Sequence, residues 1–214
     1  MRELNSYIDH TVLKPNTKPE AVEKLCKEAI ENRFYAVCVN PCYVSLCKEV
    51  IGENDVKIAS VIGFPLGANT TELKALEAKR AVEDGASEID MVINVGKMNC
   101  GDYDYILNDI KAVVDAAKVP VKVILETCLL TKEEIVKATE LSIEAGAAFV
   151  KTSTGFSIGG ATVEDVKLMA DTAAGRILVK ASGGVKTREQ ALQMIAAGAD
   201  RIGTSSGISI VTGD

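Results

Sequence analysis

The sequence predicts a single-domain α/β protein, a (β/α)8 barrel that spans residues 1–214. Three observations favour it: short runs rich in branched residues recur eight times, helix-type segments fill the spaces between them, and the length of 214 residues is near the lower limit for such a barrel. An open, doubly wound sheet is the alternative, but no Gly-x-Gly-x-x-Gly fingerprint follows the first run. The expected strands cover residues 8–10, 35–39, 57–62, 88–93, 121–125, 149–151, 177–180 and 201–203.

The first expected helix, residues 19–30, has the apolar period of an amphipathic helix. Thr17 and Glu20 stand three positions apart and predict a capping box at its start. Its buried face is expected to hold Val22, Leu25, Cys26, Ala29 and Ile30.

Signals for the start and end of helices recur further along the chain. Thr131 with Glu134 and Thr187 with Gln190 predict two more capping boxes. Because glycine adopts the left-handed conformation that ends helices, a Gly-Ala pair is expected to close a helix just before a strand at three places. These are Gly85, Gly146 and Gly198.

Composition narrows the functional classes. Hydrophobic residues make up 47% of the chain and charged residues 25%, and no apolar run reaches the roughly 18 residues of a membrane span. The net charge of -6 and the lack of a basic stripe argue against nucleic acid as a partner. The first residues lack an apolar signal region, so we expect a cytoplasmic protein that does not bind membranes.

The six cysteines form no Cys-x-x-Cys pair, and His10 is the single histidine. Neither a zinc site nor a disulfide framework is indicated, and no metal site is expected. His10 is expected to be a hydrogen-bonded barrel residue. The cysteines are expected to be small core residues, but Cys38, near a strand end, is a candidate to line the pocket.

Two lysines carry the functional signal. Lys151 and Lys180 stand at the ends of consecutive expected strands, and barrel active sites lie at the carboxyl ends of the strands. Burial and the neighbouring ammonium group are both expected to lower the pKa of a lysine. A neutral lysine amine is a nucleophile, and at this stage either lysine is a candidate.

Acidic residues on other strands are expected to join them. Alternation along residues 88–93 places Asp90 toward the interior, where a carboxylate beside two lysines can accept and return protons. Asp9 and Thr11, at the first strand, are expected to orient groups in the same pocket by hydrogen bonds. Lys122 and Glu126 are expected to form a supporting charge network.

Two glycine-containing turns predict a phosphate site. Gly183 and Gly184 follow Lys180, and Ser205 and Ser206 lie in the turn after the last strand. Loops after the seventh and eighth strands are where barrels commonly hold phosphate, through backbone N–H groups.

Several segments together resemble the deoxyribose-phosphate aldolases. The resemblance rests on FVKTSTGF at 149–156, KASGGVKT at 180–187 and EIDMVIN at 88–94. IDHTVLKP at 8–15 and GTSSG at 203–207 extend it over nearly the whole chain.

The resemblance implies a class I aldolase that needs neither metal nor cofactor. It would reversibly cleave 2-deoxy-D-ribose 5-phosphate, a phosphorylated sugar of deoxyribose catabolism, into D-glyceraldehyde 3-phosphate and acetaldehyde. Lys151 would form a Schiff base, Lys180 would lower the pKa of Lys151 and help to move protons, and Asp90 would join that relay. A homo-oligomer, expected to be a dimer, is also implied. The residues expected to bind substrate are Asp9, Thr11, Cys38, Thr152, Gly155, Gly183, Gly184, Ser205 and Ser206.

The chain departs from some family members at two places. Position 156 is Phe where some carry Lys, which leaves one fewer cation for the phosphate. A tail that ends in tyrosine, which some members have, is not in this sequence. Two alternatives stay open: another Schiff-base barrel aldolase, of the transaldolase type, would share Lys151, and a non-catalytic barrel would only bind phosphate.

Overall fold

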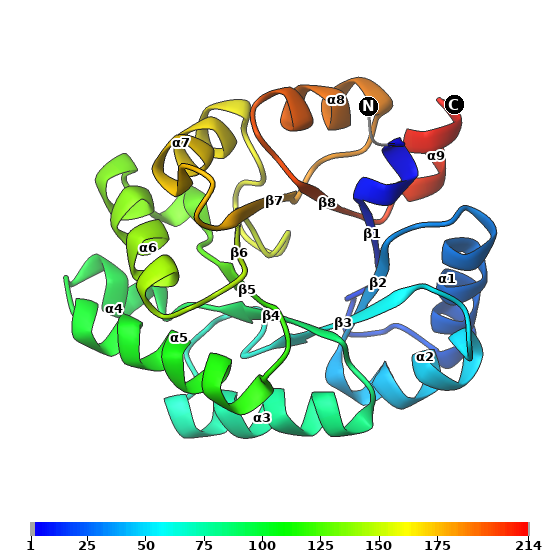
Figure 1. Ribbon diagram of the computed structural model, residues 1–214, viewed down its shortest axis with the longest axis horizontal. Helices are drawn as coiled ribbons and strands as arrows, with labels where there is room; N and C mark the ends of the chain where they lie inside the picture. Colours follow the sequence, from blue (N-terminus) through cyan, green and yellow to red (C-terminus); the bar gives the residue numbers. More distant parts are fainter. Residues whose placement is uncertain (1–2, 214) are drawn as a thin grey trace.

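The computed structural model describes residues 3–213, and their eight strands form one closed parallel barrel, as in TIM barrels (Figure 1). Each strand pairs with the next in the chain, and β8 pairs back to β1. The predicted fold class is confirmed. The strands are β1 Ile8–Thr11, β2 Ala36–Val39, β3 Lys57–Ile62, β4 Glu88–Val92, β5 Val121–Ile124, β6 Phe149–Lys151, β7 Leu178–Ser182 and β8 Arg201–Thr204.

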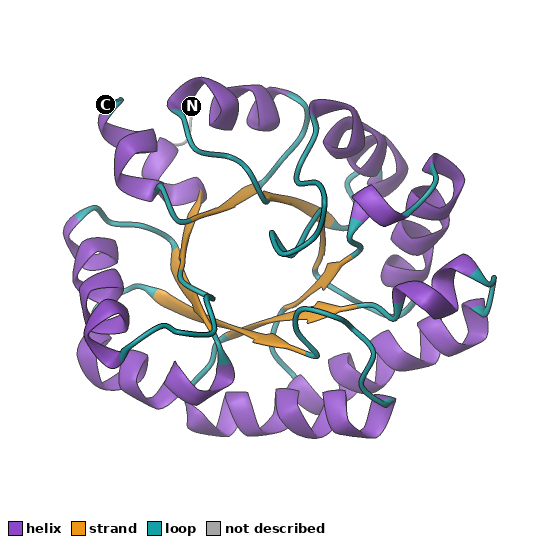
Figure 2. Ribbon diagram, turned by 180° about the vertical axis from the view of Figure 1, so that it is seen from behind, coloured by secondary structure: helices purple, strands orange, loops and turns teal. Residues whose placement is uncertain are grey.

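Helices surround the barrel in a ring, and the N- and C-terminal segments lie close to each other on one side of it (Figure 2). The α-helices are α1 Pro19–Glu31, α2 Val44–Ile51, α3 Thr71–Asp84, α4 Val95–Asn99, α5 Tyr103–Ala117, α6 Lys132–Glu144, α7 Val163–Ala173, α8 Arg188–Ala196 and α9 Gly207–Thr212. Three 3-10 turns, η1 Leu4–Tyr7, η2 Pro41–Tyr43 and η3 Thr127–Leu129, complete the connections. None of the helices in residues 3–213 has the length and apolar character needed to cross a membrane.

The capping predictions are mostly confirmed. Capping boxes are present at Thr131 and Thr187. The box predicted at Thr17 is wrong: α1 begins at Pro19 as expected, but its N-cap residue is Lys18, and the Thr17 hydroxyl donates to the carbonyl of Lys14 at 2.7 Å. The three predicted helix-closing glycines, Gly85, Gly146 and Gly198, have φ of 121°, 81° and 113°.

Strand register decides which side chains share the interior of the barrel. Lys151 is aligned with Lys180, and Lys180 is aligned with Arg201. Because side chains alternate between the two faces of a strand, aligned residues point to the same side. On the opposite wall the aligned residues are apolar: Cys38 and Ala59 belong to a small buried cluster with Val61 and Leu13. The interior is therefore charged at β6, β7 and β8 and apolar at β2 and β3.

Strand lengths also differ from the prediction in a way that matters for the site. β7 continues past Lys180 to Ser182, so Lys180 lies within the strand and not at its end. Lys151 is the last residue of β6, as predicted. The two lysines are aligned, but only Lys151 lies where its strand opens into a loop.

Gly67, in the loop between β3 and α3, lies against the end of the neighbouring strand. Its φ is +66°, and a Cβ atom there would lie 1.9 Å from the carbonyl oxygen of Ile93. Gly101 has a similar φ of +76°, but a Cβ atom there would meet nothing within 4 Å.

Gly67→Ala is expected to destabilise the protein more than Gly101→Ala. Both place Cβ in the left-handed region, which costs about 1–2 kcal/mol, and the close contact at Gly67 adds about 1–3 kcal/mol more. Denaturant unfolding of both variants measures the difference. Equal losses would show that the loop moves freely away from β4.

Candidate active site

A network of seven charged side chains lies in the barrel interior, and each is at most 4% exposed. The strands β1, β4, β5, β6, β7 and β8 supply them. We call it the barrel network; its members are Asp9, Glu88, Asp90, Lys122, Lys151, Lys180 and Arg201.

Asp90 is the centre of the barrel network. Its Oδ2 accepts hydrogen bonds from Lys151 Nζ at 2.9 Å and from Lys180 Nζ at 2.8 Å. Its Oδ1 accepts a hydrogen bond from Lys122 Nζ at 2.8 Å. The structure thus brings together the two lysines and the carboxylate that the sequence singled out, and one carboxylate oxygen links both amines.

The rest of the barrel network joins the opposite ends of the chain. Asp9 accepts hydrogen bonds from Lys180 Nζ and, at 2.9 Å, from Arg201 Nη1. Glu88 lies 2.6 Å from Lys122 Nζ and 3.4 Å from Arg201 Nη1. The Arg201 guanidinium also lies 3.4 Å from the centre of the Tyr35 ring. Each carboxylate of the network therefore has at least two cationic partners.

These contacts set the charge of the buried groups. Burial acts to raise the pKa of the Asp90 carboxyl, but its three lysine partners outweigh burial and hold that pKa well below its ordinary value. Burial acts to lower the pKa of Lys180, yet the attractions of Asp9 and Asp90 raise that pKa above its ordinary value. The expectation that burial and like charge lower the pKa of both lysines is therefore wrong for Lys180, because it did not include these carboxylates.

The barrel network holds four cationic side chains and three carboxylates. Lys122, Lys180 and Arg201 each contact two carboxylates, whereas Lys151 contacts Asp90 alone. Removing one proton from the network balances its formal charge. Lys151 is the cation with the fewest ion pairs in the network.

A pocket of about 500 Å³ opens above Lys151, at the carboxyl ends of the strands. Loops after β1, β6, β7 and β8 line it, and none of its lining residues is acidic. The segment after β6, yellow in Figure 1, curls over the opening of the barrel. Predicted site residues that line the pocket are Thr11, Lys151, Gly155, Gly183, Gly184 and Ser205.

Other predicted site residues lie beneath or beside this pocket. Asp9, Asp90 and Lys180 lie below Lys151 in the barrel network. Cys38 is fully buried, with its Sγ 3.9 Å from Asp90 Oδ2, and burial together with the Asp90 charge raises the pKa of its thiol. The Cys38 side chain therefore contacts the catalytic candidates and not the open pocket.

The side chains of Thr152 and Ser206 are not among those that line the pocket. The Thr152 hydroxyl donates to the carbonyl of Ser182 at 2.9 Å and accepts from its N–H at 3.0 Å, so it ties β6 to β7. Ser206 is the N-cap residue of α9 and lines a neighbouring groove beside His10. His10 is hydrogen-bonded to Glu28 at 2.8 Å, as expected of a barrel residue.

Sequence reasoning missed three cations of the site. Arg201 was assigned only to a strand, although an Arg at an inward position beside an Asp and a Glu marks a buried ion pair. Lys14 and Lys186 are exposed and line the pocket, and both stand within the conspicuous segments 8–15 and 180–187. Lys122 belongs to the barrel network as predicted, but Glu126 does not: its carboxylate contacts Thr154 and Cys128.

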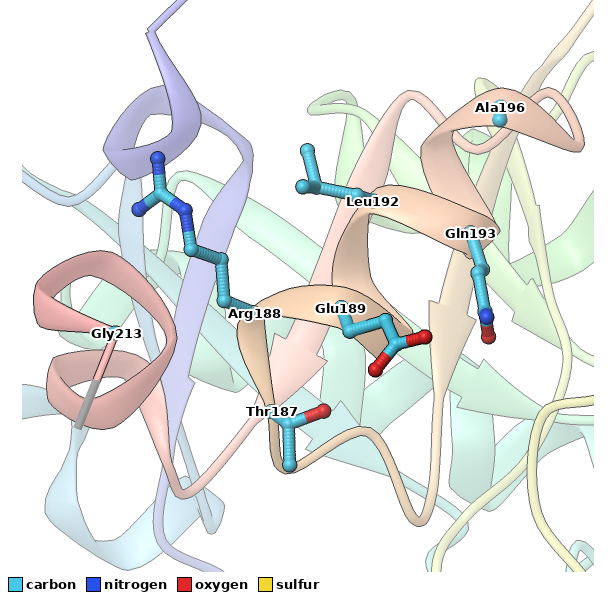
Figure 3. Close-up of a pocket in the computed structure, with 7 residues that line it drawn as sticks. All are labelled: Thr187, Arg188, Glu189, Leu192, Gln193, Ala196 and Gly213. Carbon is cyan, nitrogen blue, oxygen red and sulfur yellow. The ribbon is translucent and has the colours of Figure 1, made fainter.

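A larger cleft of about 780 Å³ lies on the outside of the barrel, beside α8 and the end of α9 (Figure 3). Arg188 crosses it toward α9 and donates to the carbonyl of Val211 at 3.0 Å. Among residues 3–213 no group of three or more His, Cys, Asp or Glu side chains is placed to hold a metal ion. The reactive side chains therefore lie in the barrel and not in this outer cleft, although the cleft has the larger volume.

A family model described as DeoC/LacD family aldolase matches residues 4–212. The chain is 60% identical over 212 residues to the deoxyribose-phosphate aldolase of Finegoldia magna, covering 99% of this chain and 100% of that protein. It is 61% identical over 217 residues to the deoxyribose-phosphate aldolase of Thermococcus kodakarensis, with 99% and 97% covered.

Solved structures agree over the whole fold. The structure described as QR15, an aldolase, has a TM-score of 0.95 at 47% identity, covering 99% of this chain and 96% of that one. The tetrameric deoxyribose phosphate aldolase of Aeropyrum pernix has a TM-score of 0.92 at 35% identity, with 98% and 89% covered.

Lys122→Met is expected to lower the free energy of unfolding by about 3–5 kcal/mol, because it leaves buried carboxylates short of a cation. Denaturant unfolding measures the loss. The matched control, Lys167→Met, breaks an exposed pair with Asp171 at 2.8 Å and should cost about 1 kcal/mol or less. A comparably small loss for Lys122→Met would contradict the central place of this lysine.

Proposed function

The chain belongs to the DeoC/LacD family of aldolases and has deoxyribose-phosphate aldolase activity, and we propose that Lys151 is the amine that forms its Schiff base. The observation that carries this assignment is the position of Lys151. It is the one member of the barrel network that lines the pocket, and it contacts a single carboxylate of that network.

The reaction begins at the C1 aldehyde of open-chain 2-deoxy-D-ribose 5-phosphate. Attack by Lys151 Nζ and loss of water give a protonated imine, which accepts the electron pair of the C2–C3 bond as that bond breaks. C1 and C2 stay bound to Lys151 as an enamine, and the C3 hydroxyl loses its proton to become the aldehyde of the departing D-glyceraldehyde 3-phosphate. Protonation of C2 and hydrolysis of the imine release acetaldehyde and restore the amine.

Asp90 and Lys180 are placed to move the protons that these steps require. Asp90 Oδ2 lies within hydrogen-bond distance of both amines, so a proton can pass between Lys151 and Lys180 through one oxygen. The attractions of Asp9 and Asp90 raise the pKa of Lys180, so Lys180 is charged between turnovers. A proton that it supplies toward C2 is balanced by the proton that the C3 hydroxyl loses. Asp9 acts by holding Lys180 in place.

The phosphate group is proposed to bind at the opposite end of the pocket. Gly183 and Gly184, with φ of 86° and 82°, expose the backbone after β7, and Ser205 follows β8. Lys14 and Lys186 add two cations at the rim, in a chain whose net charge is -6. Phe156 lines the same pocket where some relatives have a lysine, so these two lysines carry the charge.

Two further features of this function are proposals. The cytoplasm is the proposed location, since all six cysteines are free thiols, as is usual in a reducing compartment. A homo-oligomer, with a dimer as the expected state, is the proposed assembly, and light scattering of the purified chain would measure it.

Borohydride reduction in the presence of acetaldehyde is expected to add one ethyl group to Lys151, because borohydride reduces the imine to a stable amine. Peptide mapping by mass spectrometry locates the group. Lys151→Arg is the control, since a guanidinium forms no such imine, and it should stay unlabelled. An unlabelled wild type, or a label on Lys180, would refute the assignment.

Lys186→Ala is expected to raise KM for deoxyribose 5-phosphate about tenfold, because a charge-assisted contact to the phosphate is lost. Non-phosphorylated 2-deoxyribose should react with unchanged efficiency. Steady-state kinetics on both substrates separates the two effects, and Lys79→Ala on the exposed face of α3 is the matched control. A similar loss on both substrates would place Lys186 outside the phosphate site.

A further inference from the structure

We propose that Glu126 is a positioning residue of the active site, which orients the Thr154 hydroxyl toward the substrate. The proposal rests on the proposed function of Lys151, because it concerns the same pocket. Glu126 follows the end of β5, and Thr154 lies three residues after Lys151. Nothing in the reaction steps above uses either side chain.

The backbone at Glu126 is unusual for a residue with a side chain. Its φ of 56° and ψ of 61° lie in the left-handed region, which residues with a Cβ atom adopt uncommonly. Such a conformation persists where the surrounding structure determines it, and it clusters at functional sites. Here the surrounding structure is the hydrogen bonding of the Glu126 carboxylate.

That carboxylate is buried without a cation. Glu126 is 4% exposed, and within residues 3–213 no Lys, Arg or His nitrogen forms an ion pair with it. Every carboxylate of the barrel network, by contrast, has at least two cationic partners. A buried carboxylate is costly unless hydrogen bonds satisfy it. Hydrogen-bond donors must therefore stabilise Glu126 in place of cations.

Its main partner is Thr154. The Thr154 backbone N–H lies 3.2 Å and 3.4 Å from the two carboxylate oxygens, and the Thr154 hydroxyl donates to Oε2. The Cys128 thiol, at 4.0 Å from Oε1, is a weak third contact. Glu126 therefore takes both hydrogen-bond donors that Thr154 possesses.

The Thr154 hydroxyl has one hydrogen-bonding position left for a ligand, as an acceptor. Its hydroxyl proton points to Glu126, and its oxygen accepts the N–H of Phe156 at 3.0 Å. A hydroxyl oxygen has two acceptor positions, so one remains. Thr154 lines the pocket beside Lys151, where that position can accept a hydrogen bond from a hydroxyl of the substrate or of the carbinolamine.

The neighbouring backbone restricts the effect of Glu126 to Thr154. The N–H of Leu125 donates to the carbonyl of Lys151 at 2.9 Å, and the N–H of Thr127 donates to the carbonyl of Thr152 at 3.0 Å. These two bonds flank Glu126 and hold the end of β6 without its side chain. Loss of the carboxylate should therefore release Thr154 while Lys151 keeps its place.

The first experiment is steady-state kinetics of Glu126→Gln on deoxyribose 5-phosphate. Gln has nearly the same shape, but its NH2 group only donates, so just one of the two oxygen positions of Glu126 can still accept a hydrogen bond from Thr154. We expect kcat to fall about tenfold or more and KM to change less than about threefold, since the phosphate end of the pocket is unaltered. Glu144→Gln, an exposed residue at the end of α6, is the matched control and should behave as the wild type.

A double-mutant cycle with Thr154→Val tests whether Glu126 acts through Thr154. In the Thr154→Val background, Glu126→Gln should lower kcat by less than about twofold. Independent, multiplying effects, or full activity of Glu126→Gln alone, would overturn the proposal. Where Glu126→Gln does not fold, Thr154→Ser and Thr154→Val decide: Ser keeps the hydroxyl and most activity, and full activity of the Val variant overturns the proposal.

Borohydride trapping with acetaldehyde keeps the two proposals apart. The Glu126→Gln variant should still be labelled at Lys151, because its amine and its contact with Asp90 are unchanged. Failure of labelling in the wild type refutes the Schiff-base assignment. Labelling of the wild type but not of the variant refutes the positioning role, because Glu126 would then act on Lys151 itself.

Discussion

The active site depends on a single buried carboxylate, Asp90, that three lysines share. Removing that many charges from water is costly, and mutual attraction offsets the cost only when the hydrogen-bond geometry is good. Asp90 meets this condition, with three Nζ contacts between 2.8 and 2.9 Å. The other two carboxylates, Asp9 and Glu88, both contact Arg201. The buried charges therefore form one connected network and not separate ion pairs.

The parallel barrel is what makes this network possible. The residues come from strands as far apart in the sequence as β1 and β8, and closure of the sheet makes these two strands neighbours. Register then aligns Lys151 with Lys180, and alternation points both inward. A slip of one residue in β7 would turn Lys180 toward the helices and break its contacts with Asp9 and Asp90. Fold and chemistry are therefore specified by the same alignment.

Local, repeating patterns in the sequence predicted the strands and the helix starts. Properties that depend on residues far away in the sequence were not predicted. The eight strands, two capping boxes and Lys151 at a strand end follow from local patterns, and the structure has them all. The raised pKa of Lys180 does not follow, because its cause is Asp9, 171 positions away along the chain. Glu126 was likewise assigned to the charge network from its strand alone. Its partner, Thr154, is supplied by the loop after the next strand.

The two aligned lysines, Lys151 and Lys180, differ in their position within their strands and in their access to the pocket. β7 continues for two residues beyond Lys180, whose ammonium is fully buried and in contact with two carboxylates. β6 ends at Lys151, so its amine reaches the pocket and keeps one carboxylate. An amine that must attack an aldehyde has to be both reachable and able to lose its proton. This difference in access to the pocket supports the proposal that Lys151, and not Lys180, is the nucleophile.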